Sequence, residues 1–133
     1  MVYSEEIVLN VMFYSYYNIE DGYYRLLSNG FNEYSKEKGL NIYVNLEVLT
    51  PENSPLDFGN YGTTIDAFLL KKSPKYDIYF YYSAYSKKYG NHFLNLKDYL
   101  PEEYIKGFDE RILNEACSYN NELVGVVNNI NIY

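Results

Sequence analysis

Hydrophobic positions along the chain recur with two different spacings, one typical of strands and one typical of helices. Apolar, β-branched or alternating runs predict three strands, at residues 7–13, 41–49 and 76–82. Between and after them, apolar residues three to four positions apart predict helices. The helical stripes contain Tyr23, Leu27, Phe31 and Tyr34; then Tyr61, Ile65, Phe68 and Leu69; and, after Pro101, Tyr104, Ile105, Phe108, Ile112, Leu113 and Ala116. A tight turn at residues 119–122 then predicts a terminal hairpin.

This order of elements predicts an α/β fold. Strands that alternate with helices form a mainly parallel sheet with right-handed crossovers, and we expect the strand order 2-1-3 with helices on both faces. The whole chain, residues 1–133, is long enough for one such lobe and too short for two ordinary domains.

Ligands of open parallel sheets bind beyond the carboxyl ends of the strands. The segments that follow the first and third strands, residues 14–18 and 82–85, are rich in Tyr and Ser. We therefore predict a binding crevice there. Tyr14, Tyr16, Tyr17, Tyr82 and Tyr85 would supply stacking faces, while Ser15, Ser83, Asn128 and Asn129 would supply hydrogen bonds. Asn128 and Asn129 are read equally well as a turn.

The tyrosine content has a simpler explanation for most positions. The chain contains 19 Tyr, no Trp and only two arginines, Arg25 and Arg111, and Asn, Ile and Lys are abundant. An AT-rich coding sequence tends to produce this composition. Only the tyrosines placed after strand ends are therefore evidence for a binding surface.

Charge and the scarce reactive residues narrow the classes of function. The net charge of −7 disfavours binding to nucleic acid or to anionic membranes, which requires clustered Lys and Arg. Cys117 is the only cysteine and His92 the only histidine, so an internal disulfide and a zinc site built from Cys and His are excluded. We expect Cys117 to be a buried apolar residue and His92 to lie at the surface. No metal or cofactor is predicted, and no segment has the pattern of a signal peptide or a membrane span.

The sequence favours a protein that is not an enzyme. It contains no nucleophile elbow, phosphate-binding loop or dinucleotide fingerprint. The adjacent carboxylates are mostly at helix starts or on solvated faces, and none is matched by a second carboxylate on another strand end. Asp77, at the start of the third strand, is expected to be a structural acid bonded to a neighbouring backbone group.

Several of these segments together resemble bacterial extracellular solute-binding proteins of the periplasmic-binding-protein type II-like, sugar-binding class, including the version of this module in anaerobic gut fungi. The similarity lies in the first strand, a Phe-Asn-x-Tyr helix at residues 31–34 and the alternating second strand. It continues through Lys-Tyr-Asp-Ile-Tyr at residues 75–79, Phe-Leu-Asn-Leu-Lys-Asp-Tyr-Leu-Pro at residues 93–101 and the hairpin at residues 119–127.

The resemblance implies an extracellular or cell-surface protein of two lobes that closes on a sugar or oligosaccharide and hands it to a transporter or receptor. It also implies that residues 1–133 are an incomplete first lobe. A lobe without its returning strand has an unpaired sheet edge, so a homodimer or strand exchange is expected. The alternative function is a protein interaction module that assembles through the open sheet edge and a tyrosine-rich surface.

Overall fold

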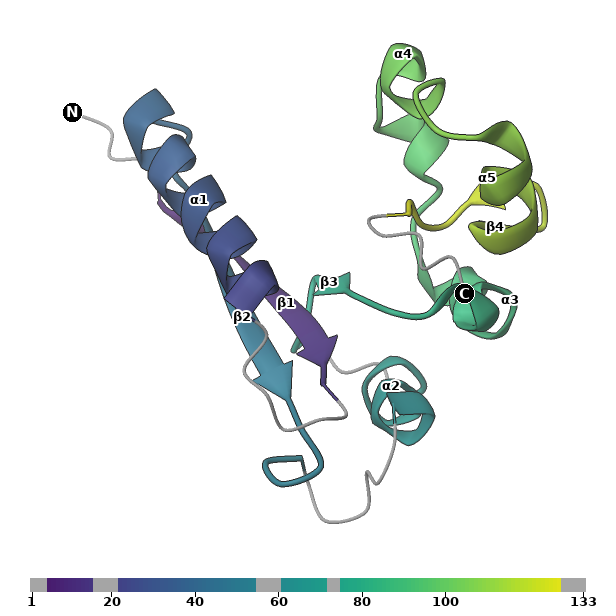
Figure 1. The fold of residues 1–133 in the computed structure, drawn as a ribbon, viewed down its shortest axis with the longest axis horizontal. Coiled ribbons are helices and arrows are strands. Elements are labelled where there is room, and N and C mark those ends of the chain that lie inside the picture. The colour runs from purple at the N-terminus through teal and green to yellow at the C-terminus, as the bar shows by residue number, and fades with distance from the viewer. Residues whose placement is uncertain (1–4, 16–21, 55–60, 72–74, 128–133) are drawn as a thin grey trace. The chain divides into compact units, whose positions relative to one another are not determined.

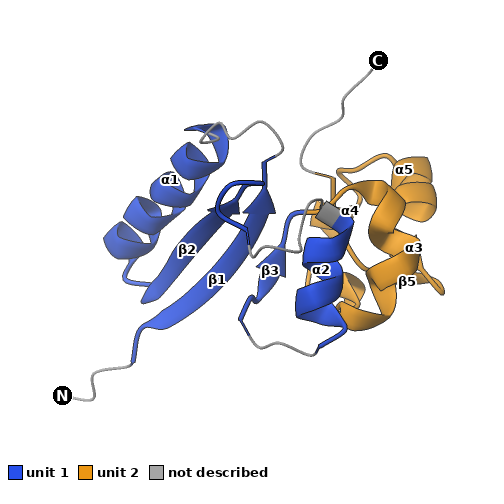
Figure 2. Ribbon diagram, turned by 90° about the horizontal axis from the view of Figure 1, so that it is seen from below, with its two compact units in different colours: residues 1–80 blue, residues 81–133 orange. Residues whose placement is uncertain are grey.

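A computed structural model describes residues 5–15, 22–54, 61–71 and 75–127 (Figure 1). The chain divides into two compact units, residues 1–80 and residues 81–133, and each is described by itself (Figure 2).

The first unit is built on a parallel sheet of three strands. Strand β1 (Ile7–Tyr14) pairs along its whole length with β2 (Ile42–Leu49) and, on its other side, with the short strand β3 (Ile78–Tyr79). The order β2-β1-β3 confirms the predicted α/β fold and its 2-1-3 topology.

Both faces of the central strand are covered. Val11 and Met12 are neighbours on β1 and point to opposite faces, yet both are buried. Helix α1 (Gly22–Lys38) packs on the face that carries Phe13, whose ring centroid lies 4.3 Å from that of Tyr24. Helix α2 (Tyr61–Leu69) follows β2, and Figure 2 shows the strands between the two helices. This arrangement agrees with helices on both faces of the sheet.

The side of α1 that meets the sheet differs from the prediction. Tyr23, Leu27 and Tyr34, which belong to the apolar stripe, are about half exposed, whereas Ser35 is buried and Asn32 half-buried. The polar pair faces the sheet because its side chains bond to the backbone of β2, as described below. The helix ends as expected at Gly39, whose φ of 64° is a left-handed conformation that favours glycine.

Strand β3 is shorter than the seven residues predicted. At the start of β3, the backbone N–H of Asn10 donates to Asp77 Oδ2 at 2.8 Å. The carboxylate of Asp77 thus accepts a hydrogen bond that a backbone carbonyl would accept in a regular sheet. The backbone N–H of Asp77 returns a bond to the Asn10 carbonyl at 2.8 Å. Asp77 is therefore the structural acid that the sequence indicated, and Phe80 N–H, bonded to the Met12 carbonyl, ends the contact with β1.

The second unit begins with three short helical turns: a 3-10 turn at Ser83–Tyr85, helix α3 (Ser86–Tyr89) and a 3-10 turn at Gly90–His92. After another 3-10 turn at Leu96–Asp98 come α4 (Glu102–Ile105) and α5 (Glu110–Ala116). The single helix expected after Pro101 was wrong. Asp109 accepts a hydrogen bond from Ile112 N–H at 3.1 Å and so caps the start of a separate helix.

The predicted hairpin is present and closes the core of the second unit. Strands β4 (Ser118–Tyr119) and β5 (Glu122–Leu123) are antiparallel, and Asn120 and Asn121 between them have φ of 48° and 64°. Positive φ at both central residues defines a type I′ turn, whose twist suits a two-residue hairpin. Leu123 packs with Leu113 and with the buried Cys117.

Candidate functional site

Five of the nine predicted contact residues lie in the described part of the chain. Tyr14 and Ser15 belong to the first unit, and Tyr82, Ser83 and Tyr85 belong to the second. Tyr16, Tyr17, Asn128 and Asn129 lie outside the described residues.

In the first unit, Tyr14 and Ser15 do not present a binding surface, which corrects the prediction for both. Tyr14 is 1% exposed and Ser15 is 9% exposed. The reason is that β1 continues one residue beyond the predicted strand, and Ser15 N–H still donates to the Leu49 carbonyl at 2.8 Å. As the last residue of a strand covered on both faces, Tyr14 is a core residue.

In the second unit, the predicted residues lie closer to the surface. Tyr82 is 52% exposed and precedes the first 3-10 turn in an extended conformation. Ser83 is exposed, and it begins that turn. Tyr85 is half-buried, and its ring stacks on that of Tyr89 with a centroid separation of 5.6 Å. One face of Tyr85 is therefore engaged in internal packing.

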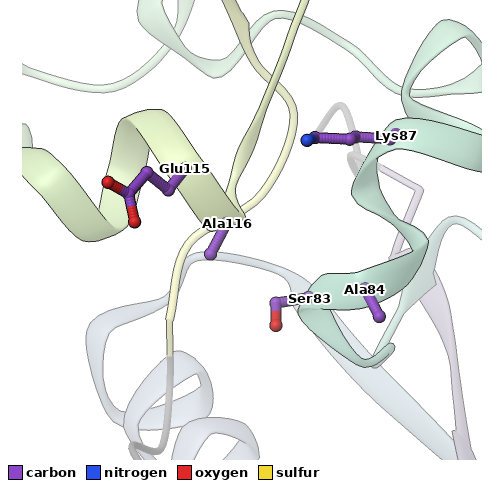
Figure 3. Close-up of a pocket in the computed structure, with 5 residues that line it drawn as sticks. All are labelled: Ser83, Ala84, Lys87, Glu115 and Ala116. Carbon is purple, nitrogen blue, oxygen red and sulfur yellow. The ribbon is translucent and has the colours of Figure 1, made fainter.

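Ser83 lines an open depression with a volume of about 340 Å³ (Figure 3). One wall consists of Ser83, Ala84 and Lys87, and the other of Glu115 and Ala116 at the end of α5. Figure 3 shows the Lys87 side chain extended towards the α5 wall. The depression thus offers a hydroxyl, an ammonium and two methyl groups to a small molecule, while Figure 3 shows the carboxylate of Glu115 turned away from the other lining side chains.

A buried hydrogen bond holds the two walls together. Ser86, which is 1% exposed, donates its hydroxyl to the carbonyl of Ala116 at 2.6 Å. Beside it, the Tyr81 hydroxyl donates to the Val124 carbonyl at 3.3 Å, and its ring stacks on Phe93. Burial raises the pKa of Tyr81, so the hydroxyl stays protonated and able to donate. A side chain at Gly125 would collide with this hydroxyl.

Sequence reasoning predicted only Ser83 of the five residues that line the depression and missed both charged ones. Lys87 and Glu115 are 28 residues apart, and neither belongs to a motif. The segments that carry them are joined by the hydrogen bond from Ser86 to the Ala116 carbonyl, which no local sequence pattern predicts. Ser83 was predicted as a contact residue because it follows the third predicted strand, and it lines the depression.

The reactive residues are placed as the sequence indicated. His92 is exposed on the 3-10 turn Gly90–His92. Cys117 is 4% exposed, and burial raises the pKa of its thiol, which disfavours the nucleophilic thiolate.

Across the described ranges, no three His, Cys, Asp or Glu side chains are grouped as a metal site would need. No helix in those ranges has the length and apolar content to cross a membrane.

An unpaired sheet edge was expected, and the outer edge of β2 is covered at three positions by side chains. Asn32 bonds to both backbone groups of Val44, through Nδ2 to the carbonyl at 2.9 Å and through Oδ1 from the N–H at 2.7 Å. The Ser35 hydroxyl contacts both groups of Ile42 in the same way, at 2.6 and 3.2 Å. Asn53 donates to the Val48 carbonyl at 3.1 Å. A partner strand would have to displace these side chains.

No protein-family model matches the chain, and no curated protein matches it either. The resemblance to extracellular solute-binding proteins therefore stays a prediction that rests on the sequence segments given above.

Proposed function

We propose that this chain is a non-enzymatic binding module for a small extracellular solute, with a carbohydrate as the expected class. The observation that supports the proposal best is the depression beside Ser83, with Lys87 and Glu115 on opposite walls and the half-exposed Tyr82 next to Ser83 in the chain. The extracellular location and the sugar class come from the family resemblance.

The chemistry of the depression suits a polyhydroxylated ligand. Sugar hydroxyls both donate and accept hydrogen bonds; the Ser83 hydroxyl can do both, and the Lys87 ammonium donates. The ring of Tyr82 offers an apolar face with a polar tip, which is the kind of surface that packs against the C–H face of a sugar ring. The methyl groups of Ala84 and Ala116 leave room for the ligand instead of competing with it.

The expected affinity is low. A pocket that binds a ligand tightly buries most of the ligand surface. The depression here is open, and its 340 Å³ is at the small end of ligand pockets. We therefore expect a dissociation constant on the order of 1 mM, which corresponds to roughly −4 kcal/mol.

The proposal is tested by NMR titration of the ¹⁵N-labelled chain with neutral trisaccharides (cellotriose and maltotriose) and with the acidic trimer of galacturonate. We expect chemical shift changes to cluster at Tyr82, Ser83 and Lys87 on one wall and at Glu115 and Ala116 on the other. Changes scattered over the chain, or no saturable change with any of the sugars, would contradict the proposal.

Two variants with matched controls locate the contact. Tyr82→Ala and Lys87→Gln should each weaken binding about tenfold, equivalent to a loss of about 1.4 kcal/mol. Tyr99→Ala removes another exposed ring, and Lys97→Gln removes another exposed ammonium, both outside the depression. If the controls weaken binding as much as the variants do, the depression is not the binding site.

A further inference from the structure

The outward side of α1 carries a continuous apolar surface, here called the α1 stripe. It consists of Tyr23, Leu26, Leu27, Phe31 and Tyr34, with Gly30 at its centre. Leu26 is 70% exposed, and the most covered member, Phe31, is still 37% exposed. Most apolar side chains of the helix therefore point away from the sheet, whereas Tyr24 packs on Phe13 and the polar Asn32 and Ser35 bond to β2. Contiguous apolar surface of this kind marks a site of protein contact.

The α1 stripe is symmetric about its own midpoint, between Ser28 and Asn29. Tyr23 and Tyr34 lie equally far from that point, as do Leu26 and Phe31, and as do Leu27 and Gly30. If two copies of α1 pack antiparallel about a twofold axis at the midpoint, Tyr23 of one copy meets Tyr34 of the other. Leu26 then meets Phe31, and Leu27 meets Gly30. Such a surface is complementary to itself, which a twofold interface requires.

Gly30 adds an independent argument for this pairing. A Cβ at Gly30 would meet nothing within 4 Å, so no contact inside the protomer requires glycine there. Glycine inside a helix costs about 0.5–1 kcal/mol relative to alanine. In the antiparallel pair this cost has an explanation, because the missing side chain leaves room for Leu27 of the second copy and lets the helices approach closely.

The area of the α1 stripe suits a weak dimer. Five half-exposed large side chains expose roughly 100 Å² each, or on the order of 500 Å² per copy. The pair would bury about 1,000 Å² in total, which is the lower limit for a specific interface. The covered edge of β2 also favours the helix over strand pairing as the route to assembly.

We propose that two copies of this chain associate through the α1 stripe, as a twofold-symmetric antiparallel helix pair. This proposal does not depend on solute binding. We expect a dissociation constant on the order of 10 μM, equivalent to roughly −7 kcal/mol.

Sedimentation velocity of the full chain tests whether the dimer forms. The sedimentation coefficient should rise from that of a monomer to that of a dimer between about 1 and about 300 μM, a range that brackets the expected constant. Leu26→Asp should weaken association at least tenfold while the circular dichroism spectrum keeps its helical signal. Leu94→Asp, which changes another well-exposed leucine outside the first unit, should leave association unchanged. A monomer at every concentration, or equal loss in both variants, would overturn the proposal.

A size exchange tests the register. Gly30→Leu should block association, because it fills the space that Leu27 of the second copy would occupy. The double variant Leu27→Gly with Gly30→Leu exchanges the two side chains and should restore association. If Gly30→Leu associates as well as the natural chain, or if the double variant fails to recover, the proposed register is wrong.

Cross-linking provides a second measure of the register. A mixture of Tyr23→Cys and Tyr34→Cys chains should form a mixed disulfide-linked dimer on mild oxidation. Tyr34→Cys alone should not, because its two copies lie about 16 Å apart along the helix axis at a rise of 1.5 Å per residue. The native Cys117 is buried and contributes little background. Efficient linkage of Tyr34→Cys alone would contradict the antiparallel arrangement.

Discussion

At the scale of single residues, buried hydroxyls join distant parts of the backbone in both units. Ser35 bonds to the Ile42 carbonyl and Ser86 to the Ala116 carbonyl, each at 2.6 Å. A buried polar group costs free energy unless it has a partner, and here each partner belongs to another element. These serines therefore fix which elements lie together, a role that their small size and polarity do not suggest in the sequence.

The burial of Cys117 leads to a prediction about reactivity and pH. Its thiol pKa is raised from the ordinary value of 9.0 in the folded chain, so the native thiol should resist iodoacetamide at about pH 8 and react readily after unfolding in urea. As the pH rises, the Cys117 thiol ionises in the unfolded chain before it ionises in the folded chain. The contribution of the buried thiol to the free energy of unfolding is therefore complete below about pH 9, and it is lost at higher pH by up to about 1.4 kcal/mol per pH unit.

Urea unfolding between about pH 8 and about pH 11, followed by circular dichroism, measures this loss. Cys117→Ala should remove the part of the decline that begins near pH 9. Tyr76, Tyr79 and Tyr81, whose pKa values burial also raises, should produce a further decline above pH 10 in both chains. Equal alkylation rates for folded and unfolded chain would contradict the prediction.

At the scale of elements, the contact of α1 with β2 is the most informative arrangement in the first unit. The helix does not bury its apolar side there. Asn32 and Ser35 instead occupy outward backbone groups of β2, much as an added strand would. Natural proteins protect sheet edges in several ways, and here the device is a pair of polar side chains on a neighbouring helix.

Asn32→Ala should therefore destabilise the chain by about 1–3 kcal/mol, because it leaves both backbone groups of Val44 without this partner. The uncovered edge should also increase aggregation on prolonged incubation. Urea unfolding and light scattering measure the two effects. Asn29→Ala changes an exposed asparagine on the same helix and should leave both unchanged or slightly improved. Similar behaviour of the two variants would show that the edge contact is unimportant.

At the scale of the whole molecule, the residues predicted for one crevice belong partly to the first unit and partly to the second. The predicted crevice joined the ends of the first and third strands in one site. The structure ends β3 at Tyr79 and assigns Tyr82 to the second unit, while Tyr14 is in the core of the first. The candidate site therefore rests on the second unit, where Lys87 and Glu115 add charges of opposite sign.

The net charge of −7 is a property of the whole chain, and it predicts that the chain does not bind nucleic acid or anionic membranes. Fluorescence anisotropy with a duplex of about 20 base pairs should show no binding at about 0.15 M salt, since affinity for the phosphate backbone depends on clustered cations. Vesicles rich in phosphatidylserine should likewise fail to retain the chain in a flotation assay. Salt-sensitive binding to either polymer would reveal a basic surface that the total charge conceals.

The sequence alone determined those features that depend on local physics. Period-2 and helical spacing predicted the alternating strands and helices, because these spacings follow from backbone geometry, and that alternation led to the expected α/β sheet. The end of α1 at Gly39 and the hairpin turn at Asn120 and Asn121 were also predictable, since few residues adopt positive φ easily. Asp77 was correctly read as a structural acid from its position at the start of β3.

Only the tertiary structure decided which surfaces are buried and which groups meet. The apolar stripe of α1 lies outward because the backbone groups of β2 bond to the polar side of the helix, an interaction between residues far apart in the chain. Tyr14 became core because β1 is covered on both faces, and the segments that carry Lys87 and Glu115 line one depression because Ser86 bonds to the Ala116 carbonyl. Hydrophobic periodicity predicts the secondary structure of a segment. Which side chains are buried, and which residues meet, depends on other segments of the chain.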